Sequence, residues 1–220
     1  MKVFAIIVGA GRGRRFGGLK QFVEFQGKPL LVYTIEHFEK NRYVNSIIVV
    51  VPKKMVAETG KLMKEYGLGK VRSIVGGGER RQDSVLNGIR KIGNARGIVI
   101  VHDAVRPFVS QKLITRGIKL CQRYKAVIFG MPVFDTIKLV KGRKVVATVP
   151  RISPYAIQTP QFFDAECLMK VYEEIDFNRE FTDEAAMLES IGIPVFVFNG
   201  ESENIKITTK QDLKILHYFK

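Results

Sequence analysis

The sequence predicts an α/β fold with a doubly wound, mainly parallel sheet. The first observation is that apolar runs rich in β-branched residues alternate with amphipathic stretches from the N-terminus to about residue 130, which is typical of parallel strands joined by crossover helices. The second is that the amphipathic stretches carry helix start and stop signals. The third is that 220 residues suffice for one sizeable core. We therefore expect a single domain over residues 1–220.

The expected strands are short and rich in valine and isoleucine, as buried parallel strands are. They span residues 3–8, 46–51, 71–75, 97–101 and 126–131. The helices between them are delimited by residues that favour helix ends: a proline in the first turn, a serine cap, or a glycine after the last turn. These helices span residues 29–40, 53–66, 82–92 and 110–124.

Residues 136–149 break this alternation. Apolar and polar residues alternate on both sides of Gly142, which is typical of a β-hairpin. Because an isolated two-stranded ribbon is marginal in water, its apolar side is expected to pack on something else. We favour a second subunit over the hairpin's own domain, so the segment at about 135–150 is predicted to be a protruding arm that forms a homodimer.

The elements after the arm are less regular. Helices are expected over residues 164–173 and 182–191, strands over residues 194–198 and 204–207, and a terminal helix over residues 210–219. Because the first strand is short, is followed by arginines and lacks a small-residue cleavage site, it is not expected to be a signal peptide. No apolar run approaches membrane-spanning length. The two cysteines show neither disulfide nor metal-ligand spacing, so a cytoplasmic protein without a membrane partner is expected.

The chain is strongly basic, with a formal net charge of +15. Such a charge favours nucleic acid, anionic membranes or polyphosphate as partners. However, no basic run is interleaved with aromatic residues, as a nucleic-acid groove would require. The arginines instead gather beside glycines at strand ends, which favours a small anionic ligand.

The loop after the first strand is the strongest local signal. It reads Gly9-Ala10-Gly11-Arg12-Gly13-Arg14-Arg15 and reaches Lys20-Gln21. Its glycines allow close approach to the backbone and its cations favour phosphate, although a glycine-rich turn with solvated arginines is an equal alternative. A dinucleotide fingerprint lacks its third glycine, and Leu19 interrupts a P-loop pattern.

Other strand ends carry polar residues that could meet the first loop, because ligands bind beyond the carboxyl ends of parallel strands. Glycines and arginines fill residues 76–84, and Asp103 follows the fourth strand. A carboxylate there is well placed to hold Mg²⁺ together with phosphate oxygens. The alternative is that Asp103 caps the turn or pairs with Arg106. His102 is expected to be structural.

Two clusters occur later in the chain. Thr182-Asp183-Glu184 is either a helix start capped by the threonine or a ligand contact. Lys206 lies between two isoleucines in the predicted strand at 204–207, and a phosphate would explain a lysine in such a place.

Seven motifs together resemble the 2-C-methyl-D-erythritol 4-phosphate cytidylyltransferases of the non-mevalonate isoprenoid pathway. They occur in order, almost from end to end: Gly9-x-Gly11-x-Gly13-x-Arg15 with Lys20-Gln21, Gly77-Gly78-x-x-Arg81-x-x-Ser84-Val85, Val101-His102-Asp103-Ala104-x-Arg106-Pro107, Pro132-x-x-Asp135-Thr136-x-Lys138, Gln158-Thr159-Pro160-Gln161, Thr182-Asp183-Glu184 and Asn204-Ile205-Lys206.

This resemblance implies a Rossmann-like nucleotidyltransferase fold and an enzyme that converts CTP and 2-C-methyl-D-erythritol 4-phosphate to 4-CDP-2-C-methyl-D-erythritol and pyrophosphate. It also implies Mg²⁺ and a homodimer. Arg15 and Lys20 would stabilise the triphosphate and its leaving group, Lys206 would lie near the reacting phosphates, and Asp103 would hold the metal. Glu203 is a second metal candidate, one methylene longer than the aspartate common in the family.

The resemblance also assigns the residues that bind the two substrates. Cytosine would be recognised around Gly9, Ala10, Gly78 and Ser84, and the sugar-alcohol phosphate by Thr136, Arg151, Thr159 and Thr182. The motif residues Gly11, Gly13, Arg81 and Arg106 are further expected substrate contacts. The loop between Arg15 and Lys20 is shorter than usual, and Leu19 replaces the customary proline.

No general base is needed for this chemistry, because a phosphate monoester with a second pKa of about 6 is mostly dianionic at neutral pH. Two alternatives stay open. One is a sister cytidylyltransferase acting on ribitol 5-phosphate, and the other is a basic RNA-binding module without catalysis.

Overall fold

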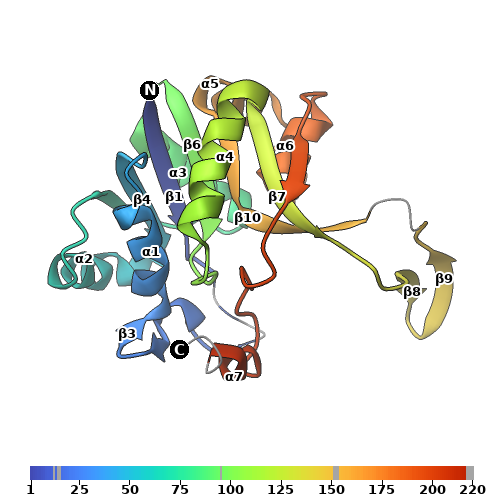
Figure 1. Ribbon diagram of the computed structural model, residues 1–220, viewed down its shortest axis with the longest axis horizontal. Coiled ribbons are helices and arrows are strands. Elements are labelled where there is room, and N and C mark those ends of the chain that lie inside the picture. Colours follow the sequence, from blue (N-terminus) through green and yellow to red (C-terminus); the bar gives the residue numbers. More distant parts are fainter. Residues whose placement is uncertain (12, 14–15, 95, 151–153, 217–220) are drawn as a thin grey trace.

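The computed structural model describes residues 1–11, 13, 16–94, 96–150 and 154–216. Its centre is a seven-stranded sheet in the order β11-β7-β10-β6-β1-β4-β5 (Figure 1). Neighbouring strands are parallel except β10, which is antiparallel to both β6 and β7. The expected doubly wound, mainly parallel α/β fold is therefore confirmed.

The strands of the main sheet are β1 Lys2–Val8, β4 Ser46–Val51, β5 Val71–Gly76, β6 Gly97–Asp103, β7 Ala126–Pro132, β10 Tyr155–Asp164 and β11 Phe196–Asn199. The α-helices are α1 Leu30–Lys40, α2 Val56–Glu65, α3 Arg81–Ile92, α4 Gln111–Tyr124, α5 Ala165–Glu174, α6 Glu184–Ser190 and α7 Asp212–Leu216. Short 3-10 turns lie at Lys20–Phe22 and Lys53–Met55, and β2 Glu24–Phe25 pairs with β3 Lys28–Pro29.

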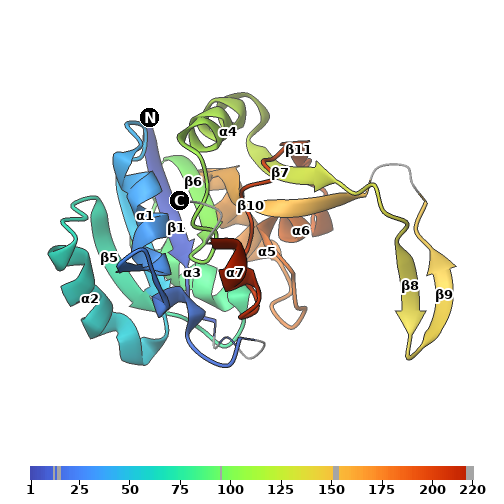
Figure 2. The same cartoon turned by 60° about the horizontal axis from the view of Figure 1, so that its bottom comes forward.

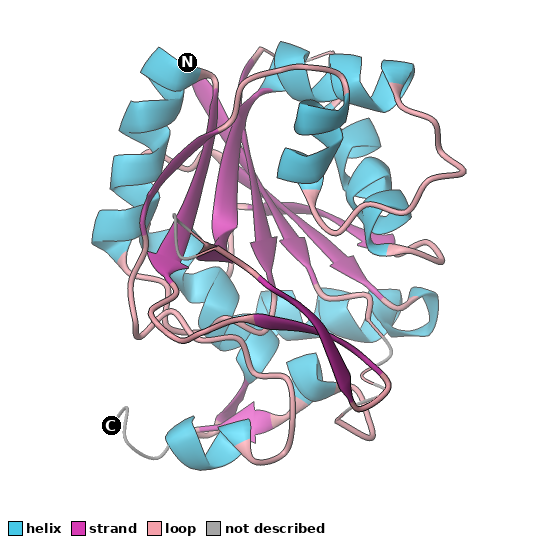
Figure 3. Cartoon of the chain, turned by 90° about the vertical axis from the view of Figure 1, so that its right-hand side faces the viewer, coloured by secondary structure: helices cyan, strands magenta, loops and turns pink. Residues whose placement is uncertain are grey.

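Helices cover both faces of the sheet (Figure 3). Side chains alternate across a strand, so Ala5 and Ile7 of β1 face a core shared with α1, α2 and α4. Phe4 and Ile6 face the opposite core, shared with α3, α5 and α6. Because both faces of β1 are buried, its run of apolar residues is continuous, as the sequence indicated.

The central strand β10 was not among the predicted strands. The segment Gln158-Thr159-Pro160-Gln161 separates the apolar residues at the two ends of β10. The register of β10 with β7 shifts between Gln158 and Phe162. Because proline cannot donate to a ladder, it argues against a central strand in a sequence pattern. The structure accommodates Pro160 at this irregularity, where the Thr159–Pro160 peptide is cis.

Two smaller predictions are wrong. The segment 204–207 is not a strand. Ile207 N donates to Val105 O at 2.9 Å, as in a strand pair, but Asn204 O accepts from the side chain of Arg106, at 2.7 Å from Nη1. A side-chain bond therefore replaces one of the backbone bonds that a strand would need. The α6 helix is capped by Asp183, whose carboxylate accepts from Ala186 N at 2.9 Å, rather than by Thr182.

The predicted hairpin is present. Strands β8 Lys138–Lys141 and β9 Lys144–Thr148 pair with each other around Gly142 and project from the body (Figure 2). Every residue of the two strands is exposed, including Leu139, Val140, Val145 and Val146. None of the helices in the described ranges is long and apolar enough to cross a membrane.

Candidate active site

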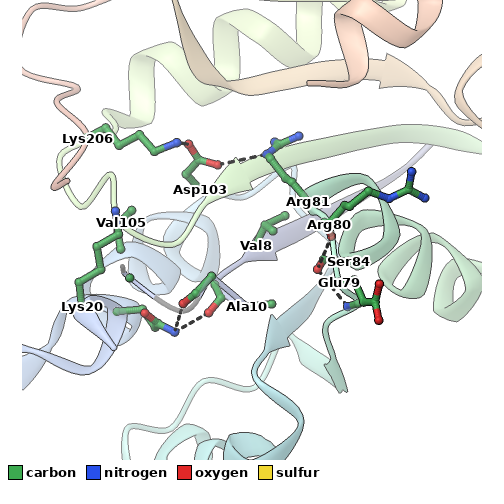
Figure 4. Close-up of a pocket in the computed structure, with 15 residues that line it drawn as sticks. Val8, Ala10, Lys20, Glu79, Arg80, Arg81, Ser84, Asp103, Val105 and Lys206 are labelled. Carbon is green, nitrogen blue, oxygen red and sulfur yellow. Dashed lines mark hydrogen bonds and ion pairs between the residues drawn. The ribbon is translucent and has the colours of Figure 1, made fainter. Parts of the chain in front are cut away.

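A cavity of about 660 Å³ opens beyond the carboxyl ends of β1, β5 and β6 (Figure 4). It is lined by the loop after β1, the loop after β5, the end of β6 and the segment before α7. The residues are Val8, Gly9, Ala10, Gly11, Gly13, Lys20, Gln21, Gly78, Glu79, Arg80, Arg81, Ser84, Asp103, Val105 and Lys206. Ten of the predicted site residues are thereby brought together: Gly9, Ala10, Gly11, Gly13, Lys20, Gly78, Arg81, Ser84, Asp103 and Lys206.

The first loop is built close to the sheet. Gly9 N donates to Val50 O at 2.7 Å, and a Cβ at Gly9 would lie 3.0 Å from the Cβ of Ala104. The buried side chain of Gln21 donates to Gly9 O at 2.6 Å. In the sequence Gln21 is visible only as part of a motif, and the structure shows that it fixes the backbone that lines the cavity.

The loop then turns back at Gly13. This residue has φ of +63°, and its carbonyl accepts from the amides of Phe16 and Gly17. A Cβ at Gly13 would lie 1.9 Å from Gly18 O, so both the positive φ and the close approach require glycine. The predicted catalytic residue Arg15 lies outside the described residues.

Lys20 belongs to the first 3-10 turn and reaches the segment before α7. Its Nζ donates to Ile207 O at 2.7 Å. Ile207 is fully buried with Phe16, Phe25 and Val105 in a small apolar cluster beside the cavity. Through these contacts the first loop and the chain carrying Lys206 are packed together.

The second loop follows β5 and packs against the first. A Cβ at Gly77 would lie 2.1 Å from the Cβ of Ala10, which leaves room only for glycine. Gly78 N donates to Ser84 Oγ at 3.1 Å, and Ser84 Oγ donates to Arg80 O at 3.1 Å. These bonds fix the second loop to the first turn of α3, and the loop contacts the first loop through Gly77 and Ala10.

Asp103 ends β6 beside three cations, of which Lys206 and Arg81 are labelled in Figure 4. Its Oδ2 lies 2.7 Å from Lys206 Nζ, and its Oδ1 lies 3.7 Å from Arg81 Nε. Arg106 Nε lies 3.7 Å from Oδ2. Burial opposes ionisation of Asp103, but the charges of Lys206, Arg81 and Arg106 outweigh it and hold its pKa well below the usual range. The carboxylate is therefore ionised at neutral pH.

Two predicted contacts lie behind the cavity wall. Thr159 Oγ1 accepts a bond of 3.0 Å from Asp103 N, and both Thr159 and Arg106 are buried. Burial lowers the pKa of Arg106 in spite of Asp103. His102 is also fully buried, with Nε2 3.2 Å from Arg106 O, and burial lowers its pKa to about 3. This agrees with the structural role expected for His102.

Arg81 is hydrogen-bonded to the fully buried carboxylate of Glu184. Its Nη1 lies 2.9 Å from Oε1 and 2.7 Å from Oε2 of Glu184. Burial alone would lower the pKa of Arg81, but Glu184 and Asp103 raise it well above its ordinary value. Glu184 was noted in a motif without a role of its own, and only the tertiary contact shows its partner.

The remaining predicted residues lie away from the cavity lining. Thr182 is exposed before α6, Thr136 is exposed at the base of the arm, and Glu203 is exposed before Lys206. Arg151 lies outside the described residues.

The carboxylate at the cavity suits a magnesium ion that arrives with phosphate. In the described part of the chain, no group of three or more His, Cys, Asp or Glu side chains could hold a metal ion. Mg²⁺ needs fewer, because it is commonly bound by one or two carboxylates, with waters and substrate phosphates completing its shell. Asp103 is ionised and lines the cavity, so it fits this mode of binding.

Comparisons with known proteins agree on one family. The family model described as 2-C-methyl-D-erythritol 4-phosphate cytidylyltransferase matches residues 3–219. Proteins of that name from Alkaliphilus metalliredigens and Dictyoglomus thermophilum are 42% and 39% identical, covering 97% and 96% of this chain and 91% and 94% of their own lengths.

Solved structures give the same result. The crystal structure of 4-diphosphocytidyl-2C-methyl-D-erythritol synthase from Anaerococcus prevotii matches with a TM-score of 0.85 at 30% identity, covering 99% of this chain and 95% of that one. The 2-C-methyl-D-erythritol 4-phosphate cytidylyltransferase from Thermus thermophilus matches with a TM-score of 0.81 at 29% identity, covering 100% and 98%.

Proposed function

This chain belongs to the 2-C-methyl-D-erythritol 4-phosphate cytidylyltransferase family, and on that premise we propose that CTP and 2-C-methyl-D-erythritol 4-phosphate react in the cavity at the carboxyl edge of the sheet. A phosphate oxygen of the acceptor attacks the α-phosphorus of CTP. The bond from that phosphorus to the bridging oxygen breaks, and pyrophosphate leaves. The product is 4-CDP-2-C-methyl-D-erythritol.

The chain supplies charge and position rather than a base. The acceptor phosphate is mostly dianionic at neutral pH, because its second pKa is about 6. An in-line displacement of this kind needs reactants held in place and negative charge stabilised. The cavity supports this role because Lys20, Arg81 and Lys206 line it together.

Lys20 and Arg15 are proposed to stabilise the triphosphate and the departing pyrophosphate. Lys206 is proposed to lie near the reacting phosphates, where it must exchange its contact with Asp103 for a phosphate oxygen. Asp103 is proposed to hold Mg²⁺, which when bound would neutralise triphosphate charge. Glu203 is a weaker second candidate, because its side chain is exposed and does not line the cavity.

The cytosine ring is proposed to lie between the two glycine loops, against Gly9, Ala10, Gly78 and Ser84. Backbone groups can distinguish the hydrogen-bonding edge of a base when glycines allow close approach. Gly11, Gly13 and Arg81 would contact the rest of the nucleotide.

The acceptor side is proposed to be completed by Thr136, Arg151, Thr159 and Thr182, and Arg106 is proposed as a further substrate contact. Thr136 lies at the base of an arm whose apolar residues are exposed. We therefore propose a homodimer in which the arm at about 135–150 packs on a second copy. Both described cysteines are free, which supports a cytoplasmic location.

The observation that carries the proposal is the gathering of Lys20, Lys206 and Asp103 around one cavity. The test is pyrophosphate release from CTP with Mg²⁺ and either 2-C-methyl-D-erythritol 4-phosphate or ribitol 5-phosphate. Release with the first acceptor at a higher kcat/KM is expected. Preference for ribitol 5-phosphate would overturn the acceptor assignment, and tight RNA binding without release from either acceptor would overturn the enzyme assignment.

A further inference from the structure

Arg81 and Asp103 are close, yet they do not form the tight ion pair that their chemistry favours. Arg81 Nε lies 3.7 Å from Asp103 Oδ1, which is beyond hydrogen-bond range. Arginine and carboxylate commonly form two parallel bonds at about 2.8 Å when nothing restrains them. Something therefore holds the guanidinium back.

The restraint is Glu184. Both of its carboxylate oxygens accept from Arg81 Nη1, at 2.9 and 2.7 Å. Glu184 is fully buried, and Tyr172 Oη lies 3.4 Å from its Oε1. Because Glu184 opens the helix α6 and packs inside the second core, it cannot follow the arginine towards the cavity.

Arg81 keeps spare donors for Asp103. Its Nη2 is buried and has no hydrogen-bond partner in the described residues. Nε and Nη2 form the side of a guanidinium that binds a carboxylate with two bonds. If Glu184 released Nη1, a small shift would therefore let this side close on Asp103.

We propose that Glu184 is a positioning residue that holds Arg81 away from Asp103, so that Asp103 Oδ1 remains open to a divalent cation. This inference rests on the proposed function, in which Asp103 holds the metal that accompanies CTP. On the Oδ2 side, Lys206 is 41% exposed and can move towards phosphate. On the Oδ1 side, the side chain of Arg81 is 24% exposed, and its Nη1 is held by both carboxylate oxygens of Glu184.

The experiment measures Mn²⁺ binding in the presence of saturating CTP, from the electron paramagnetic resonance signal of free Mn²⁺. Glu184→Gln keeps the size of the side chain and removes its charge. We expect it to weaken Mn²⁺ binding by about 10- to 100-fold, as loss of an outer-shell partner does. Glu189→Gln is the matched control, because Glu189 lies on the same helix and is exposed; it should bind Mn²⁺ as the wild type does.

A double variant separates positioning from a general loss of structure. Arg81→Met with Glu184→Gln removes the charges of both residues, so no guanidinium at residue 81 can close on Asp103. Its Mn²⁺ affinity should exceed that of Glu184→Gln alone. Wild-type affinity in folded Glu184→Gln, or a double variant no better than the single one, overturns the inference.

If Glu184→Gln does not fold by circular dichroism, the double variant is compared with Asp103→Asn. Binding about tenfold tighter than Asp103→Asn supports the inference, and equal binding overturns it. Failure of the proposed function looks different. A wild-type chain that binds no Mn²⁺ with CTP, or an Asp103→Asn chain that binds it normally, overturns the metal assignment at Asp103 and with it the role of Glu184.

Discussion

The cavity and the β8–β9 arm differ in how their residues are held. Around the cavity, Gln21, Asp103 and Glu184 are buried and each has a partner from another part of the chain. Along the arm, every residue of β8 and β9 is exposed and the two strands pair only with each other. The described cavity residues are held by contacts within one chain, whereas the arm exposes an apolar surface of the kind that marks an interaction site.

This difference suggests that the cavity serves nucleotide binding and that the arm serves assembly. The nucleotide side of the reaction needs groups fixed before the substrate arrives, because preorganised charge is what lowers the barrier. The arm can instead be ordered by assembly. The predictions below test whether the two regions are separable in this way, beginning with the largest expected effect.

Deletion of residues 138–147 should convert the proposed dimer into a monomer, because it removes the exposed valines of the hairpin. Sedimentation velocity measures the assembly state, and calorimetry measures CTP binding with Mg²⁺. We expect the monomer to keep nucleotide binding, since the cavity residues come from elsewhere in the chain. A deletion variant that remains dimeric would contradict the role of the arm.

Lys20→Ala should lower kcat by about a hundredfold or more, as loss of one preorganised charge does. The chain should remain folded, because the hydrogen bond from Lys20 to Ile207 O lies at the cavity edge and not in the two main cores. Steady-state pyrophosphate release measures the effect. Lys61→Ala, on the exposed side of α2, is the control. Turnover within threefold of wild type would remove Lys20 from the site.

Gly77→Ala should destabilise the chain and weaken nucleotide binding. The added methyl would lie 2.1 Å from the Cβ of Ala10, so the two loops must separate. Overpacking of this kind costs about 1–3 kcal/mol of unfolding free energy. Urea denaturation measures this cost, and the companion variant Gly77→Ala with Ala10→Gly should recover part of it. No recovery would mean that the loops are not in contact.

His102 should make stability depend on pH. Burial lowers its pKa from 6.5 to about 3 in the folded chain. Between these values the unfolded chain binds a proton that the folded chain does not. The free energy of unfolding therefore falls as the pH falls through this window, by up to about 1.4 kcal/mol per pH unit.

Urea denaturation at pH 7 and pH 5 tests this dependence. The loss of stability between the two values should be smaller in His102→Gln than in the wild type. An equal loss in both proteins would show that the surroundings of His102 are not as dry as its burial indicates.

The sequence predicted the parts of the fold and site that depend on local pattern. Parallel strands such as β1 and β4 read as continuous apolar runs because both faces are buried, and the loops that follow strands carry the glycines and charges of the cavity. The hairpin around Gly142 was also predictable, since the alternation of apolar and polar residues around a turn residue defines it.

Parts that depend on tertiary contacts were not predictable in this way. The strand β10 is antiparallel and interrupted at Pro160, so neither period nor composition marks it. The role of Glu184 depends on Arg81, 103 residues earlier in the chain. The contacts from Asp103 N to Thr159 Oγ1 and from Arg106 Nη1 to Asn204 O likewise join distant parts of the chain, and no local pattern marks them.

The central claim is that the first loop and its neighbours bind CTP with Mg²⁺ before any acceptor is present. Isothermal titration of CTP and Mg²⁺ into the folded wild-type chain tests it most directly. We predict saturable binding of one nucleotide per chain, weakened roughly tenfold or more when Lys20 is replaced by alanine, because a charge-assisted bond is lost. No heat of binding by well-folded wild-type protein would contradict the account.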